Sequence, residues 1–222
     1  RYNDRSVLEN YHVYKAFSLL RLDPSCDFTL CMSQKDRRTF RKFIVDLVLC
    51  TDMTMHLDYV SRFNTKVLAG LNMDSPDDRL LLMQVLLKCS DISNIAKCGR
   101  TYRAWTNRCL EEFFRQGDKE RELGMTVSPF CDRTQTNIGN SQASFIEYAG
   151  RPLFAAISSI LKPEGAAVIM SNIQANKASW EKETTQMPRA TGSRPSPLDT
   201  SRFSNNNKPQ TVSHKPSQLT ST

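Results

Sequence analysis

The sequence lacks several patterns that place a protein in a familiar class. It has no run of about 18 apolar residues, so we expect no helix that spans a lipid bilayer. His-Glu-x-x-His, Cys-x-x-Cys and Gly-x-x-x-x-Gly-Lys, the spacings of common zinc sites and phosphate loops, are all missing. Histidine is scarce, with three residues at positions 12, 56 and 214. Spacing alone therefore predicts no metal site.

Cysteine usage and charge exclude further classes. The seven cysteines are an odd number without paired spacing, which favours free thiols in a reducing compartment. Of the net charge of +7, much lies in residues 188–222, where five cations meet one aspartate and Phe203 is the one aromatic residue. A nucleic-acid surface would need clustered cations beside stacking rings, so we expect no nucleic-acid partner. No signal peptide is visible, and a cytoplasmic location is the default expectation.

Apolar residues recur at helical spacing along most of the chain and predict an all-α multi-helix bundle. One domain is expected over residues 1–187, and a disordered tail rich in Ser, Thr and Pro over 188–222. Helices are predicted near 7–20, 40–50, 75–91, 100–124, 141–157 and 163–183.

Local signals refine some of these helices. Ser75 and Pro76 form a helix start, with a capping hydroxyl followed by a residue that has no amide proton to lose. Ser141 is expected to open a helix that Pro152 kinks. The stretch 40–50 is apolar nearly all round, which predicts a helix buried on several sides.

The most informative residue is Asp91, an acid at the end of a strongly apolar helix. A buried carboxylate needs a cation or several hydrogen bonds, and a metal ion is one candidate. For a lone aspartate, a carboxylate that reaches the surface, or that takes a backbone amide or an arginine, is the commoner case.

The neighbouring motifs favour the metal. In order along the chain they are Leu8-Glu9-Asn10, Asp91-Ile92-Ser93-Asn94, Tyr102-Arg103-Ala104-Trp105-Thr106, Glu111-Glu112-Phe113-Phe114, Ser128-Pro129-Phe130-Cys131-Asp132 and Ser141-Gln142. From Asn3 to about Trp180 the chain resembles the catalytic domain of class I 3′,5′-cyclic nucleotide phosphodiesterases. It begins with Arg1 inside a motif, so we expect a fragment, the C-terminal two-thirds of that domain.

The resemblance implies a two-metal hydrolase. A zinc and usually a magnesium ion bind a hydroxide that attacks the cyclic phosphate and yields a 5′-monophosphate. Asp91 matches one of four metal ligands in the family. The other three ligands, and the histidine that protonates the leaving oxygen, would lie before Arg1. The resemblance therefore implies that this fragment alone is inactive.

Resemblance also assigns roles near the phosphate. Glu9 and His12 match an acid that orients water and a histidine beside the phosphate, with Tyr11 in place of the family's first histidine. His56 matches a family histidine as well, although packing between helices explains it equally well. The resemblance places Met53 near the nucleotide, whereas its residue type alone favours a position in the core.

For the purine, resemblance points to Gln142 and Phe145. One amide offers both a donor and an acceptor, and a ring three residues later shares its helix face and can stack on the base. A purely structural Gln/Phe pair remains open. Asn94 and Tyr102 match residues near the base, and Cys109 takes the position of the family's opposing aliphatic side chain.

Two other functions stay open. A degenerate homologue that binds a nucleotide or a partner without hydrolysis would account for Tyr11, Cys109 and the missing ligands. A purely structural helical module explains the apolar periodicity but not the ordered motifs. The preference for cyclic AMP or cyclic GMP and the oligomeric state are not predicted.

Overall fold

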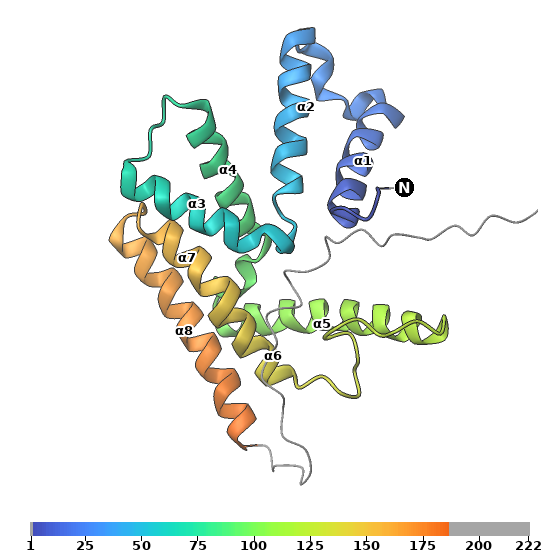
Figure 1. Cartoon of the computed structure of the whole chain (residues 1–222), viewed down its shortest axis with the longest axis vertical. Helices are drawn as coiled ribbons and strands as arrows, with labels where there is room; N and C mark the ends of the chain where they lie inside the picture. Colours follow the sequence, from blue (N-terminus) through green and yellow to red (C-terminus); the bar gives the residue numbers. More distant parts are fainter. Residues whose placement is uncertain (1, 187–222) are drawn as a thin grey trace, which may run out of the picture. The chain divides into compact units, whose positions relative to one another are not determined.

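The computed structural model describes residues 2–186, so the predicted tail at 188–222 lies outside the described residues. Residues 2–186 contain helices and turns without any strand, which confirms the all-α prediction. No helix in this range is long and apolar enough to cross a membrane. The helices are α1 (Val7–Leu22), α2 (Gln34–Leu49), α3 (His56–Ala69), α4 (Pro76–Asp91), α5 (Gly99–Glu122), α6 (Ile138–Phe145), α7 (Arg151–Ser158) and α8 (Pro163–Gln186) (Figure 1).

Helix ends follow the local chemistry where the sequence signals are strong. The Ser75 hydroxyl accepts the amide of Asp78 at 3.4 Å, and Pro76 fills the first position of α4 as predicted. Helix α5 ends at Glu122, just before Gly124 adopts a φ of 68°, a backbone conformation that favours glycine. These two helices carry the predicted site residues Asp91, Tyr102 and Cys109.

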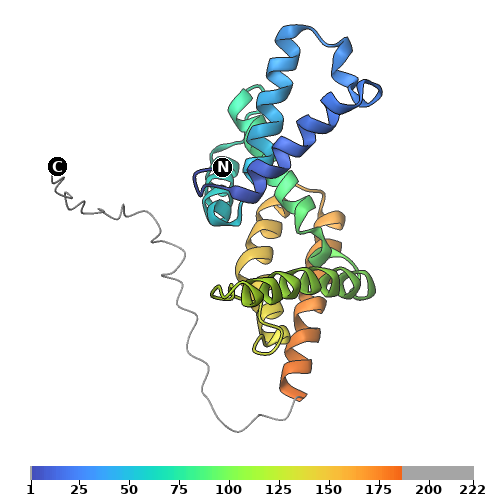
Figure 2. The ribbon, with the colours of Figure 1, turned by 90° about the vertical axis from the view of Figure 1, so that its right-hand side faces the viewer.

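The hydrophobic core lies where α3, α4, α5, α7 and α8 meet. Helices α7 and α8 pack against each other, and α5 runs across α8 rather than along it (Figure 2). The most enclosed side chains of this core are Phe63, Val85, Ile95, Tyr102, Ile146, Leu153 and Ile173.

The prediction that residues 40–50 form a helix buried on several sides is wrong. The helix forms, but no side chain of α2 is buried, and Phe43 is exposed. Among the described residues α2 packs mainly against α1 and α4, and two neighbours cannot cover a helix that is apolar nearly all round.

The segment around Pro152 differs in detail from its prediction. Helix α6 begins at Ile138, because the Asn137 side chain caps it by accepting the amide of Asn140 at 2.9 Å. The irregularity falls before the proline, in a π-turn, η5 (Ile146–Gly150). Pro152 has no amide hydrogen and its ring crowds the carbonyl four residues earlier, so the wider turn accommodates it.

Candidate functional site

Three helices meet at a hydrogen-bonded chain that ends on Gln142. The indole Nε1 of Trp180 in α8 donates to the phenol oxygen of Tyr102 in α5 at 2.7 Å. The Tyr102 hydroxyl in turn donates to Oε1 of Gln142 in α6 at 3.1 Å. Burial raises the pKa of Tyr102, so the phenol remains a protonated donor. This Trp180–Tyr102–Gln142 chain brings two predicted site residues together.

The donor chemistry fixes the direction of this chain. An indole N–H only donates, so the Tyr102 oxygen accepts and its own proton remains for Gln142. One lone pair of the Gln142 amide oxygen is then occupied, and Nε2 is not engaged by Tyr102. The Arg103 guanidinium lies over the Trp180 ring, 3.4 Å from its centroid, and pairs with Glu183, which holds the indole in place.

Phe145 and Asn94 lie on the two elements that flank Gln142. Phe145 is half-buried one helical turn after Gln142, so the two share a face of α6. Asn94 is half-buried in a 3₁₀ turn, η4 (Ser93–Ala96). The buried amide of Asn176 holds that turn by donating to the carbonyls of Ile95 and Lys97, each at 2.9 Å. Helix α8 therefore supports both sides of the predicted base site.

The acidic residues lie at the ends of α1 and α4. Asp91 is exposed at the end of α4, so the argument that its burial demands a partner is wrong. Glu9 is half-buried in the first turn of α1, and His12 is exposed one turn later. The Ser6 hydroxyl donates to Asp52 Oδ2 at 2.8 Å and ties the start of α1 to the 3₁₀ turn η3 (Met53–Met55).

A buried lysine lies within range of the charges of these acids. Lys88 is 2% exposed, and its ammonium donates to the carbonyl of Cys50 at 2.8 Å. Burial lowers the pKa of Lys88, while the charges of Asp91, Asp52 and Glu9 act in the opposite direction. The charges of acids from two helices and a turn thus converge on one cation.

Cys109 faces the same region from α5. The residue is exposed, but partial burial of the thiol raises its pKa, and the negative charges of Glu112 and Asp91 add to the effect. Cys109 follows Tyr102 by two helical turns, which places both on one face of α5. Cys109 is therefore close enough to Asp91 to feel its charge, on the face of α5 that carries Tyr102.

His56 behaves as a packing residue and Met53 does not. His56 is 3% exposed, and its Nε2 donates to the Ala149 carbonyl of η5 at 3.0 Å. Burial lowers the pKa of His56, and the nearby Lys88 ammonium lowers it further. Met53 is exposed, which excludes the core role that its residue type suggests.

Metal ligands are incomplete in the described range. Residues 2–186 contain no cluster of three or more His, Cys, Asp or Glu side chains that could hold a metal ion. Asp91 offers a carboxylate in contact with solvent, a ligand type that suits zinc and magnesium. Among the described residues, the structure therefore leaves Asp91 as a predicted metal ligand without partner ligands beside it.

Sequence reasoning missed two residues of this region. Trp180 lies in the predicted last helix without a functional role, and Lys88 received no role. A tryptophan near the end of an amphipathic helix gives no signal for the hydrogen bond that its indole makes 78 positions away. A lysine that follows a mostly apolar stretch, residues 80–87, and precedes Asp91 by three positions is a weak signal for a buried cation.

Comparison with known proteins identifies the family of this chain. A model of the 3′5′-cyclic nucleotide phosphodiesterase family matches residues 1–173. The chain is 38% identical over 194 residues to the probable 3′,5′-cyclic-AMP phosphodiesterase pde-4 of Caenorhabditis elegans, covering 84% of this chain and 28% of that protein. It is 39% identical to a 3′,5′-cyclic-AMP phosphodiesterase, isoform F, of Drosophila melanogaster, covering 86% and 30%.

A solved structure shares the fold as well. The structure of LmjPDEB1 in complex with IBMX superposes with a TM-score of 0.74 at 33% identity, over 82% of this chain and 54% of that one. The chain spans about three-tenths of the length of the two curated relatives described above. By sequence and by structure, the chain belongs to the 3′5′-cyclic nucleotide phosphodiesterase family.

Proposed function

We propose that the protein containing this chain hydrolyses 3′,5′-cyclic nucleotides to 5′-monophosphates, with cyclic AMP as a substrate. The Trp180–Tyr102–Gln142 chain is the observation that supports this most strongly, because it holds one amide in a defined orientation. The relatives named as cyclic-AMP phosphodiesterases support the choice of cyclic AMP.

The amide of Gln142 would recognise the purine edge. With one lone pair of Oε1 taken by Tyr102, the amide keeps its second lone pair and both Nε2 protons for a ligand. Adenine offers an amino donor beside a ring-nitrogen acceptor, which matches one acceptor and one donor on a single amide. Guanine offers the reverse order, so an amide that cannot flip discriminates between the two bases.

Phe145 would stack on the base that Gln142 pairs with. The two side chains lie three residues apart on α6, and stacking on an aromatic ring stabilises a bound base by about 1–3 kcal/mol. Cys109 would close the opposite side from α5. Asn94, held through η4 by Asn176, would add a polar contact near the base.

At the phosphate end, this chain would contribute Asp91, Glu9 and His12. Asp91 would hold one of two divalent ions, and Glu9 and His12 share a face of α1, three residues apart. Divalent ions supply acidified water and neutralise charge on phosphoryl oxygens when bound. Since residues 2–186 lack a cluster of three metal-binding side chains, we infer that this chain by itself does not hydrolyse cyclic nucleotides.

A binding role without hydrolysis is the second candidate, and Lys88 favours it. The buried ammonium of Lys88 interacts with the charges of Asp91 and Glu9. It therefore already neutralises part of the negative charge that a metal site needs. Tyr11, which replaces a histidine of the family pattern, points the same way.

The base-recognition proposal is tested by the variant Gln142→Ala in the longer protein. We expect the KM for cyclic AMP to rise roughly tenfold while kcat changes little, because contacts made equally in the ground and transition states are lost. Gln174→Ala is the matched control, since Gln174 is exposed on α8. An unchanged KM in Gln142→Ala would show that Gln142 is structural.

A further inference from the structure

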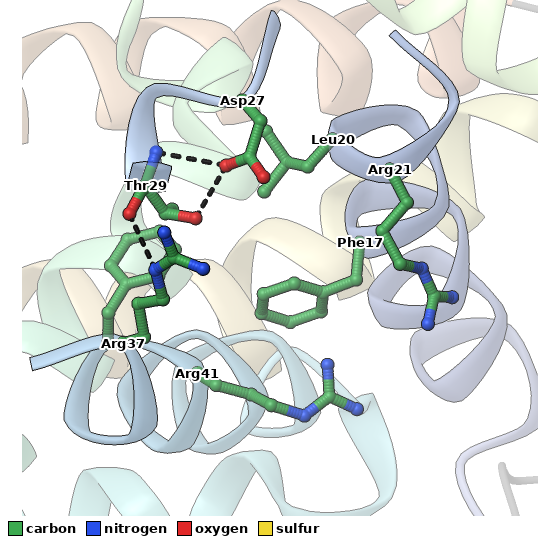
Figure 3. Close-up of a pocket in the computed structure, with 8 residues that line it drawn as sticks. Phe17, Leu20, Arg21, Asp27, Thr29, Arg37 and Arg41 are labelled. Atoms are coloured by element: carbon green, nitrogen blue, oxygen red, sulfur yellow. Dashed lines mark hydrogen bonds between the residues drawn. The ribbon is translucent and has the colours of Figure 1, made fainter. Parts of the chain in front are cut away.

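A cavity with both charged and apolar walls lies away from the residues described above, between α1 and α2. Its volume is about 150 Å³, and none of the predicted site residues lines it. Its walls combine three arginines with an apolar floor, formed by Arg21, Arg37, Arg41, Phe17, Leu20 and Phe40 (Figure 3).

Arg41 is positioned by an aromatic ring. Its guanidinium lies over Phe17, 4.4 Å from the ring centroid, and Phe17 packs edge-on against Phe40. Stacking occupies the flat face of a guanidinium and leaves its N–H edge free. Arg41 therefore presents preorganised donors at the cavity.

Arg37 forms a fixed part of the wall. Its Nε donates to the carbonyl of Thr29 at 2.8 Å, and its second terminal nitrogen donates to the carbonyl of Leu30 at 2.9 Å. These partners are uncharged, so the positive charge of Arg37 is not neutralised by them. Arg37 adds charge to the cavity while its side chain remains in place.

The single acid of the cavity is engaged locally. Oδ1 of Asp27 accepts the backbone amide of Thr29 at 3.0 Å and also the Thr29 hydroxyl, which caps the short 3₁₀ turn η2 (Phe28–Cys31). Among residues 2–186, Asp27 forms no ion pair with the arginines of the cavity. Three arginines and one carboxylate thus line the cavity.

We propose that this cavity, the Arg21–Arg41 pocket, binds a phosphate monoester, as presented by a phosphorylated serine or threonine of a partner protein. Guanidinium groups pair with phosphate oxygens in a bidentate manner, and several cations suit a group with nearly two negative charges. The floor of Phe17, Leu20 and Phe40 would contact the apolar residues beside the phosphorylated side chain. The cavity would hold the phosphate group but not the peptide, which would lie across its mouth.

The test is a binding titration of the full chain at constant ionic strength. The probes are a short peptide with leucines on both sides of a phosphoserine, its unphosphorylated twin, and inorganic phosphate. We compare the wild type with the double variant Arg21→Gln/Arg41→Gln. The control is Arg38→Gln/Lys42→Gln, which removes the same charge from exposed positions of α2 that do not line the cavity.

We expect the phosphopeptide to bind, and its affinity to fall at least roughly tenfold in Arg21→Gln/Arg41→Gln while the control keeps wild-type affinity. Far-ultraviolet circular dichroism checks that both doubles remain folded. Equal weakening in the two doubles would show unspecific charge attraction and overturn the proposal. If inorganic phosphate binds as tightly as the phosphopeptide, the ligand is the free ion and the proposed partner protein is excluded. Absence of phosphopeptide binding would exclude the site.

Discussion

Trp180 and Tyr102 are joined by a hydrogen bond of 2.7 Å between two helices that cross in the core. The indole proton leaves the Tyr102 hydroxyl free to donate in one direction, toward Gln142. The orientation of the proposed purine-binding amide is therefore set by a residue on α8, 38 positions after Gln142.

Removal of the indole donor should loosen that orientation. In Trp180→Phe of the longer protein, we expect the KM for cyclic AMP to rise roughly fivefold, in line with about 1 kcal/mol for one hydrogen bond, and the preference for cyclic AMP over cyclic GMP to narrow. Steady-state kinetics with both nucleotides measure the KM and the nucleotide preference. Trp105→Phe is the control, because Trp105 is the other tryptophan and is exposed. An unaltered nucleotide preference in Trp180→Phe would show that the indole only packs.

The His56 contact predicts a pH dependence of stability. The pKa of His56 in the folded protein lies below its ordinary value of 6.5, so the unfolded chain binds more protons near that pH and the free energy of unfolding rises with pH. Stability contributed by neutral His56 is thus present above pH 6.5 and lost as pH falls below it. Denaturant unfolding between pH 7.5 and 5.5 measures it.

The variant His56→Asn isolates this effect. It removes the titrating group, so its stability should depend less steeply on pH than that of the wild type over the same interval. His12→Asn serves as control, because His12 is exposed. Identical slopes in the wild type and His56→Asn would contradict a neutral, buried His56.

Close contact between Gly150 and Ile95 predicts a second stability effect. A Cβ added at Gly150 would lie 2.1 Å from Cδ1 of Ile95, which is fully buried in the core. Gly150→Ala should lower the free energy of unfolding by about 1–3 kcal/mol through overpacking. Adding Ile95→Val removes Cδ1 and should restore part of the loss. Gly165→Ala, with open space around its Cβ, should be neutral or stabilising.

Chemical denaturation measures the free energy of unfolding of Gly150→Ala, Ile95→Val, Gly150→Ala/Ile95→Val and Gly165→Ala. The double variant decides the cause: if Gly150→Ala/Ile95→Val is less stable than the sum of the two single changes, a different contact explains the cost. Because Ile95 belongs to η4 and Gly150 to η5, this contact also sets how Asn94 lies relative to the helix of Gln142.

Local signals predicted most helices but not α3, and they predicted burial poorly. Ser75 and Pro76 determine the start of α4 through their own chemistry, so sequence alone was sufficient. The burial of α2 depends on which other elements surround it, and the apolar pattern cannot supply that information. The π-turn η5 arises from the conflict between Pro152 and the preceding carbonyls, and a sequence pattern indicates a kink without giving its form.

The candidate site was predictable only through resemblance. Gln142 and Tyr102 lie 40 residues apart, and no periodicity within either helix indicates that they share a hydrogen bond. Lys88 and Trp180 needed the structure, because their partners belong to other elements. The roles of Glu9, His12 and Asp91 stay predictions.

The measurement that tests the account most directly is hydrolysis of cyclic AMP to 5′-AMP by the longer protein, with Asp91→Ala beside Asp77→Ala. Asp77 is an exposed acid at the opposite end of α4, so its loss matches the change in charge. We predict metal-dependent hydrolysis that falls more than about a hundredfold in Asp91→Ala and persists in Asp77→Ala. Full activity in Asp91→Ala, or no hydrolysis by the wild type with zinc and magnesium supplied, would contradict the proposed function.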